Sequence, residues 1–555
     1  MYDREHGRRE FRVFLRLFSL LYPIMCLRFL YYGFRYFYQL DDYIQYFNYE
    51  HFGGSKLGLI RRLGLLAARP LAGLADLFIW AKTFDNMIIA VLGLTALHAT
   101  AAVLLYLIFR RHFDVSFMFF PVLCLTPMNF EGTYWVSASS RILCGLFFAV
   151  ASGWFLQRFA DCGKWYHILL FAVLQLVSFG FYEQAMLFSI ALTLVIALLN
   201  LRSLGQKALW ALLWIPNFCS YMGFTWLFRD SSLYGQRMEL VLPNTSYYFR
   251  VFLPEVLQQL KSAFLGGGFY ITWRGFFRGL RIMLQDHAWF YLLLILCAAG
   301  VFLLFASKEK VPCEKPAGKK MSMRKQGLAT LLCGIILGVA PVIPFFFIAN
   351  PWFSIRCTVM SFAGIALVVE SLLIFAAVPV GRRTTMLKPI VATAAIIIFL
   401  TASVAELHDY RVTTENDVAI VQKLDSAIGD VTSGEKIVAL NLDPSYLVEQ
   451  SYFYHEHIHG VTESQWALTG ALQAIGNRPS VPSVTPIAST VPIYKSYDDF
   501  GDYDLCYLFD NGDFVPLKRD SLGHGLFDFY DMEGCLRVRV KRDQNGRGIL
   551  EIQGD

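Results

Sequence analysis

Residues 86–109 read NMIIAVLGLTALHATAAVLLYLIF and contain no Asp, Glu, Lys or Arg. A helical apolar run of about 20 residues matches the hydrocarbon core of a bilayer. The whole chain has a similar character, because 56% of its 555 residues are hydrophobic and only 17% are charged. Soluble proteins carry about 25% charged residues. This composition excludes an ordinary cytosolic enzyme and a disordered scaffold, and it predicts an α-helical polytopic membrane protein.

Eleven apolar segments qualify as transmembrane helices. The third is short and contains Pro121, and the fifth and sixth form a tight hairpin around Glu183. The first segment is basic, contains Arg28 and lacks a small-residue cleavage pattern, so we interpret it as a retained span. The segments cover about residues 13–34, 86–109, 115–128, 141–157, 165–181, 185–201, 208–228, 288–307, 327–349, 357–380 and 389–407.

Lys and Arg are distributed unequally between alternate connecting segments. With a cytoplasmic N-terminus, the inner segments hold the N-terminal arginines and the basic run 308–325. The short outer segments 129–140, 182–184 and 350–356 hold Arg356 alone. This asymmetry is the positive-inside pattern. It predicts a multi-pass protein of the cell membrane with an odd number of spans, a cytoplasmic N-terminus and an extracytoplasmic C-terminus.

Two long outer loops, 41–85 and 229–287, also carry cations. Long loops cross the membrane regardless of their charge. Alternatively, some of these cations hold an anionic group, for which the planar fork of Arg is suited. Residues 57–80 interleave apolar and basic side chains in the manner of a helix lying in the membrane interface. The cations that such a helix brings to headgroup level are Arg61, Arg62 and Arg69.

The chain becomes polar after residue 407. Residues 435–442 and 503–509 read as buried strands, and 535–542 alternates as a half-exposed strand does. Residues 1–407 are therefore predicted to form the transmembrane domain, and residues 408–555 a small α+β domain outside the membrane.

An acidic pair, Asp41 and Asp42, follows the first predicted span. A carboxylate at the membrane surface can act as a general base on an acceptor hydroxyl, and its neighbour can raise its pKa by like-charge repulsion. Asp is also favoured at helix N-caps, which gives the pair a purely structural alternative.

Several features together resemble the GT-C superfamily, the polytopic membrane glycosyltransferases that use polyprenyl-phosphate sugars. The acidic pair stands in DDY (41–43), amphipathic segments follow it, and the third hydrophobic segment is short. The other features are GTYWVSASSR (132–141), GFYEQ (180–184), NPWFSIRC (350–357) and a soluble final domain. The resemblance covers most of residues 1–410 as an architecture.

The resemblance implies that a sugar passes from a polyprenyl-phosphate donor to a cell-envelope glycan or lipid on the extracytoplasmic face. It assigns the catalytic carboxylate to Asp41 or Asp42. Some members need a divalent cation such as Mg²⁺ or Mn²⁺ and others do not, and Glu131 or Glu183 would supply the second acidic group. The candidates for binding the donor phosphate are Arg61, Arg62, Arg69, Arg141 and Arg356.

Glu131, Tyr134, Trp135 and Glu183 lie at the outer ends of predicted spans. Trp and Tyr at such positions are usually interfacial anchors. Contact with a sugar is the functional alternative, and we include Glu131, Tyr134 and Glu183 among the candidate substrate-binding residues.

A transporter or flippase of a lipid-linked envelope precursor is the main alternative function, and a non-catalytic assembly protein is a third. Glu370 favours transport, because a carboxylate within a span is a functional candidate; it could also bond to a buried group such as His98. The chain has no Gly-rich phosphate loop. The basic run 308–325 lacks the interleaved aromatics of a nucleic-acid site. We therefore expect lipids rather than nucleic acid as partners.

Overall fold

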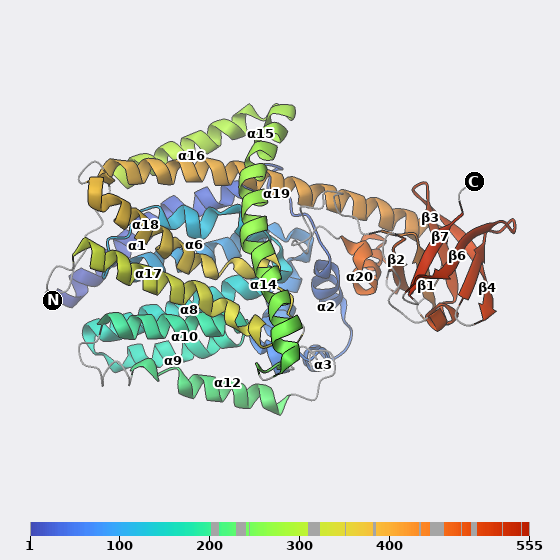
Figure 1. The fold of residues 1–555 in the computed structure, drawn as a ribbon, viewed down its shortest axis with the longest axis horizontal. Helices are drawn as coiled ribbons and strands as arrows, with labels where there is room; N and C mark the ends of the chain where they lie inside the picture. The colour runs from blue at the N-terminus through green and yellow to red at the C-terminus, as the bar shows by residue number, and fades with distance from the viewer. Residues whose placement is uncertain are drawn as a thin grey trace. The chain divides into compact units, whose positions relative to one another are not determined.

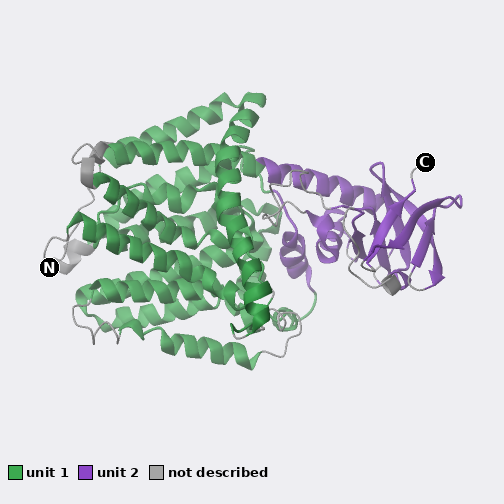
Figure 2. Cartoon of the chain, in the orientation of Figure 1, with its two compact units in different colours: residues 1–36, 53–407 green, residues 37–52, 408–555 purple. Residues whose placement is uncertain are grey.

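The chain forms two compact units, which Figure 2 shows in different colours. Unit 1 combines residues 1–36 with 53–407, and unit 2 combines residues 37–52 with 408–555. Residues 41–52, which were predicted to begin an outer loop of the transmembrane domain, therefore belong to the same unit as the C-terminal strands. The computed structural model of the protein describes residues 2–200, 210–228, 240–243, 245–308, 322–349, 351–380, 384–431, 434–443, 460–478, 480–489, 497–523, 526–544 and 547–553.

Unit 1 is helical, and its long helices lie side by side (Figure 1). Its short helices are α3 (Lys56–Arg62), α4 (Leu65–Ala68), α5 (Pro70–Ala75) and α7 (Glu131–Tyr134). Its longer helices are α1 (Tyr2–Cys26), α6 (Ile88–Arg110), α8 (Val136–Cys162), α9 (Trp165–Phe179), α10 (Glu183–Asn200), α12 (Ile215–Leu227), α16 (Trp289–Lys308), α17 (Met323–Val339), α18 (Ser361–Val380) and α19 (Thr384–Ile428), the last continuing into unit 2.

Six helices in the described part of the chain are long and apolar enough to cross a membrane, by length and composition. They cover Ile88–Arg110, Val136–Cys162, Glu183–Asn200, Trp289–Lys308, Met323–Phe346 and Leu387–Ile428. Two shorter apolar helices cover Trp165–Phe179 and Ser361–Ala377. These helices give unit 1 the character of a multi-pass membrane protein, whereas the number of eleven spans and the orientation of the termini stay predictions.

Three predicted spans take a different form. Residues 115–128 are not one helix, but contain a π-helical turn, Pro121–Leu125, and a 3₁₀ turn that begins at Pro127. Proline lacks the N–H that a continuous helix needs, which explains the break. The first span, 13–34, ends as an α-helix at Cys26, and the described part of 208–228 contains the 13-residue helix α12.

Helices α17 and α18 pack backbone against backbone. A Cβ on Gly364 of α18 would lie 2.1 Å from the nitrogen of Gly338 and 2.3 Å from the oxygen of Gly334, both in α17. Small residues spaced four apart allow membrane helices to approach this closely. These glycines therefore define the closest approach of the two helices.

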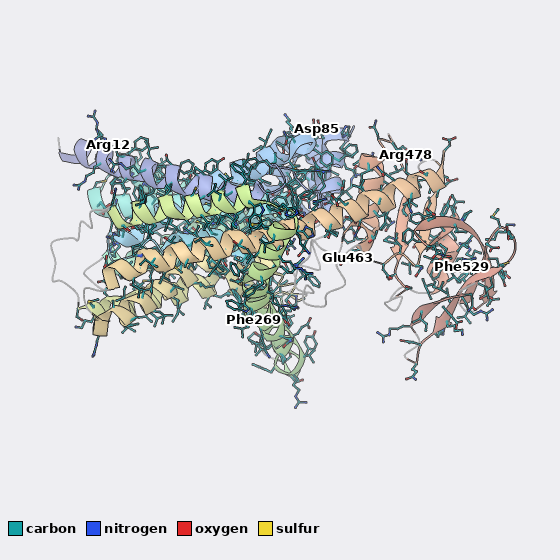
Figure 3. The ribbon with its side chains drawn as sticks, turned by 90° about the horizontal axis from the view of Figure 1, so that it is seen from above. Arg12, Asp85, Phe269, Glu463, Arg478 and Phe529 are labelled. Carbon is teal, nitrogen blue, oxygen red and sulfur yellow. The ribbon has the colours of Figure 1, made fainter. Side chains whose placement is uncertain are left out.

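A helical segment from Tyr248 to Gln285 runs across the long helices (Figure 1). It comprises η8 (Tyr248–Phe252), α14 (Leu253–Lys261), η9 (Ser262–Gly267), η10 (Tyr270–Arg274) and α15 (Gly275–Gln285). Its exposed aromatic side chains include Phe269, labelled in Figure 3, Trp273 and Phe277. Exposed aromatics interleaved with arginines are typical of a segment in the membrane interface. The described part of the predicted outer loop 229–287 is thus largely helical.

The described residues of unit 2 form a seven-stranded sheet with the order β2-β1-β3-β4-β5-β6-β7. Strand β1 (Lys436–Leu440) lies between β2 (Ser483–Ile487) and β3 (Leu505–Asp510) and is parallel to both. The helix α20 (Gln465–Ile475) lies between β1 and β2 in the chain. The remaining strands are antiparallel: β4 (Asp513–Gly523), β5 (Leu526–Tyr530), β6 (Leu536–Arg542) and β7 (Gly548–Ile552).

The sheet has a continuous apolar core. Val438 in β1, Leu508 in β3, Phe529 in β5 and Val538 in β6 are fully buried in it, and Figure 3 labels Phe529. The three strands predicted from sequence correspond to β1, β3 and β6. This part of the prediction is correct, because short apolar runs, alternation and turn residues are local signals.

Candidate functional site

Two ion pairs hold the ends of helix α5 in unit 1. Arg69 directly precedes α5, and its Nε donates to the two carboxylate oxygens of Glu183 at 3.0 and 3.1 Å. Asp76 directly follows α5 and accepts from Nη2 of Arg141 at 3.1 Å and from Oγ of Ser140 at 3.3 Å. The two pairs fix α5 to the second turn of α8 and the first turn of α10.

The two ion pairs differ in their access to solvent. The Asp76 side chain is fully buried, and that of Arg141 is 11% exposed. The side chains of Arg69 and Glu183 are 20% and 22% exposed. The Arg69 guanidinium also lies over the ring of Tyr182, 4.4 Å from its centroid. A ligand can therefore reach the Arg69–Glu183 pair more easily than the Asp76–Arg141 pair.

Arg356 joins this region from the 3₁₀ turn Ile355–Thr358. Its guanidinium carbon lies 5.1 Å from the ring centroid of Trp135. A Cβ on Gly132 would lie 2.9 Å from the carbonyl oxygen of Arg356, so only glycine permits this approach without a shift. The Gln184 side chain donates to the carbonyl oxygen of Cys357 at 2.9 Å. The turn is thus attached to both α7 and α10.

We call this group the loop-side cluster. It contains every predicted substrate-binding residue except Arg61 and Arg62, which are exposed on α3. Glu131 is buried, and Tyr134 donates its hydroxyl to the carbonyl oxygen of Arg35 at 3.2 Å. The members of the loop-side cluster are Arg69, Asp76, Glu131, Tyr134, Trp135, Arg141, Tyr182, Glu183 and Arg356.

Three helices, α8, α10 and α18, begin beside the loop-side cluster. Helix N-termini carry a partial positive charge that favours anions. Guanidinium groups bind phosphate through paired hydrogen bonds, and carboxylates can accept hydrogen bonds from sugar hydroxyls. The cluster therefore combines groups suited to a phosphate with groups suited to a sugar.

The two predicted catalytic carboxylates lie in unit 2, where their surroundings differ. Asp42 is fully buried. Its Oδ2 accepts from the backbone nitrogen of Gln39 at 3.0 Å, and its own nitrogen donates to the Gln39 carbonyl oxygen at 2.9 Å. The Gln39 side chain donates in turn to Thr414 of α19 at 2.7 Å. Asp42 stands at the N-terminus of the π-helical turn Tyr43–Asn48, but its side chain makes no capping hydrogen bond to that turn and instead holds the backbone of the preceding Gln39.

Asp41 is partly exposed, and its Oδ1 accepts from Nε1 of Trp466 at 2.9 Å. The adjacent Tyr43 is buried, and burial followed by the charges of Asp417 and Asp42 raises the pKa of its phenol well above the usual value. Tyr43 is therefore a protonated hydroxyl at neutral pH. Of the acidic pair, Asp41 is the carboxylate that a substrate can reach.

Glu370 has a local structural partner. Its carboxylate accepts from the backbone nitrogen of Ser116 at 2.9 Å and from the Ser116 hydroxyl at 2.6 Å. The hydrogen bond to His98 considered from sequence is not formed, and both ring nitrogens of His98 have no hydrogen-bond partner among the described residues. The buried Glu370 carboxylate therefore accepts from the partly buried Ser116 near the beginning of the broken segment 115–128.

The structure adds Asp76, Tyr182 and Trp466 to the residues found by sequence reasoning. Asp76 had a local signal, since it is the only acidic residue in the amphipathic stretch 57–80. Trp466 had none, because its partner Asp41 is distant in the chain. No group of three or more His, Cys, Asp or Glu side chains within the described ranges could hold a metal ion.

No known protein family model matches the chain, and no curated protein matches it either. The candidate function is therefore argued from the residues and their geometry.

Proposed function

We propose that the protein is a membrane glycosyltransferase that moves a sugar from a polyprenyl-phosphate donor to a cell-envelope glycan or lipid. The loop-side cluster is the observation that supports this proposal. It gathers Arg69, Arg141 and Arg356 with acidic and aromatic side chains in a unit of apolar helices. A polyprenyl-phosphate sugar requires apolar surface for its long tail and charged or polar groups for its phosphate and its sugar.

The proposed reaction is a displacement at the anomeric carbon of the sugar. The acceptor hydroxyl gives its proton to a carboxylate, and its oxygen bonds to the anomeric carbon. The bond from that carbon to the lipid phosphate oxygen breaks, and the phosphate leaves with the negative charge. Guanidinium groups and helix N-termini stabilise such a charge.

Asp41 is the better candidate for the base within the acidic pair. Its carboxylate is partly exposed, and the Trp466 indole orients one of its oxygens. The buried Asp42 carboxylate is instead engaged with the backbone of Gln39. A general base must be within reach of the acceptor proton, which favours Asp41.

The transporter alternative depended on Glu370 as an unexplained carboxylate inside a span. Its two hydrogen bonds to Ser116 supply a structural reason for its presence. Glycosyl transfer is therefore the function that we favour.

A sugar-transfer assay tests the proposal. It combines the purified chain with radiolabelled polyprenyl-phosphate sugars and envelope extract. We expect Asp41→Asn to abolish sugar transfer while donor binding persists. Asp85→Asn is the matched control, because Asp85 is an exposed acidic residue of unit 1 (labelled in Figure 3) outside the loop-side cluster. The proposal fails if the wild type transfers no sugar from any donor, or if Asp41→Asn transfers as fast as the control. Movement of unchanged donor across vesicles would then favour transport.

A further inference from the structure

Arg28 places a guanidinium group inside unit 1. It lies in the 3₁₀ turn Leu27–Phe29 that follows α1, and it is fully buried. Its Nε reaches the carbonyl oxygen of Met25 at 3.4 Å, which is a long hydrogen bond. Neither Nη1 nor Nη2 has a hydrogen-bond partner among the described residues. The two nitrogens that form the fork of the side chain are therefore unsatisfied.

The neighbours of Arg28 are neutral or apolar. Its guanidinium carbon lies 5.1 Å from the ring centroid of Phe29. In the described part of the chain, the titratable groups that interact with its charge are the thiols of Cys124 and Cys26, the phenol of Tyr291 and the imidazole of His98. The Tyr291 hydroxyl itself donates to the carbonyl oxygen of Leu27 at 2.6 Å. No carboxylate is among these neighbours.

His98 of α6 is the second unsatisfied group in this region. It is fully buried and within electrostatic range of Arg28. Its Nδ1 and Nε2 both lack a hydrogen-bond partner within the described residues. A neutral imidazole carries one N–H, so His98 can donate one hydrogen bond to a ligand beside Arg28.

A buried, unpaired charge is unfavourable, because desolvation removes hydration that nothing replaces. A charged residue inside a membrane domain is accordingly a candidate functional site. The missing partner of Arg28 is an anion. A planar carboxylate would use only the guanidinium fork, whereas a tetrahedral phosphate offers a further oxygen to His98.

We propose that Arg28 and His98 form a buried binding site for a phosphate group. Nη1 and Nη2 of Arg28 donate to two phosphate oxygens, and His98 donates to a third. The site contains no member of the loop-side cluster. It does not depend on glycosyl transfer, because a transporter of a phosphate-bearing lipid would need the same recognition.

Binding measurements on the full chain in lipid nanodiscs test this site. The probes are polyprenyl phosphate and inorganic phosphate, each titrated against the wild type, Arg28→Met and His98→Phe. The control is Arg110→Gln, which removes a guanidinium that is already paired with Asp114 at 2.6 Å. We expect Arg28→Met to weaken phosphate binding by about tenfold or more. His98→Phe should weaken it by a smaller factor, and Arg110→Gln should bind as the wild type does.

The two probes separate the sources of the phosphate. Tighter binding of the lipid identifies a lipid headgroup, and equal binding identifies a free phosphate; either result supports the site. If neither probe binds the wild type, or Arg28→Met binds both with wild-type affinity, the proposal is overturned.

Thermal unfolding without phosphate provides a second readout. Arg28→Met should raise the unfolding temperature, because it removes an unpaired buried charge. Added phosphate should raise the unfolding temperature of the wild type but not of Arg28→Met. A lower unfolding temperature for Arg28→Met, with no phosphate effect on the wild type, would assign Arg28 a structural role and overturn the proposal.

Discussion

The indole Nε1 of Trp466 donates a 2.9 Å hydrogen bond to Oδ1 of Asp41, although the two residues are 425 positions apart. Trp466 belongs to α20, against which the turn after Asp42 packs closely. A Cβ on Gly470 of α20 would lie 3.3 Å from the backbone nitrogen of Ile44. This packing separates the acidic pair into a reachable carboxylate, Asp41, and a buried one, Asp42.

The two aspartates should respond differently to truncation. Asp42→Ala leaves the buried N–H of Gln39 without its acceptor and should lower the stability of unit 2 by about 1–3 kcal/mol. Asp41→Ala should change it by no more than about 0.5 kcal/mol. Hydrogen exchange over residues 37–52 in the full chain measures both effects. Similar losses of protection in the two variants would contradict the assignment.

The contact between α17 and α18 should not tolerate a methyl group. Gly364→Ala places a Cβ 2.1 Å from the Gly338 nitrogen, and backbone atoms cannot move aside as a flexible side chain can. Overpacking of this kind costs about 1–3 kcal/mol. Gly300→Ala is the control, because a Cβ at Gly300 has nothing within 4 Å. Thermal unfolding in detergent should show a lower unfolding temperature for Gly364→Ala, but not for Gly300→Ala. Equal unfolding temperatures for Gly364→Ala and the wild type would refute the close contact.

The Arg69–Glu183 pair should behave as a coupled unit. Arg69→Gln removes the guanidinium that makes both hydrogen bonds between the start of α5 and α10, and Glu183→Gln removes the negative charge and one of the two acceptor oxygens. The sum of the stability losses of the two single variants should exceed the stability loss of the double variant. The difference is the coupling energy, which we expect to be about 0.5–1 kcal/mol because the pair is partly exposed. Denaturation of the four proteins of the cycle measures it. Additive losses would show that the two side chains do not interact in solution.

The Asp528–Arg539 pair should make the stability of the sheet depend on acid pH. Two hydrogen bonds from Arg539, at 2.8 and 2.7 Å, lower the pKa of the Asp528 carboxyl from its ordinary value of 3.8. The folded state therefore binds this proton less readily than the unfolded state. The pair makes its full contribution to the stability of the folded sheet above pH 3.8. That contribution is lost as the pH falls through the lowered pKa.

Asp528→Asn is the variant that tests this pH dependence. It should lower the stability of unit 2 near neutral pH and flatten its decline in acid. Hydrogen exchange of β5 and β6 between pH 6 and pH 2, corrected for intrinsic rates, measures the difference in protection. An unchanged slope in the variant would show that another carboxyl causes the acid dependence.

Two substitutions of Glu370 distinguish a structural role of this residue from a role in transport. Glu370→Leu removes both acceptors of Ser116 and should lower the unfolding temperature of the full chain, because a partly buried backbone N–H and hydroxyl lose their partner. Glu370→Gln keeps one acceptor oxygen and should retain sugar transfer. Complete loss of function in a folded Glu370→Gln protein would instead indicate that the charge itself is used.

The sequence by itself determined the class of the protein and many of its helices and strands. Apolar runs such as 88–109 become helices because a backbone in hydrocarbon must satisfy its own hydrogen bonds. Short apolar runs likewise identified β1 and β3, and a period-two pattern identified β6. Both signals act between neighbours in the chain, so they can be read without the fold.

Tertiary structure alone decided which polar residues meet and which are buried. Asp42 and Asp41 are adjacent in sequence, yet only packing against α19 and α20 gives them different surroundings. The local pattern likewise does not show that Asp76 pairs with Arg141, or that Nη1 and Nη2 of Arg28 have no partner among the described residues. Burial and pairing depend on segments far apart in the chain, whose approach is governed by packing rather than by local periodicity.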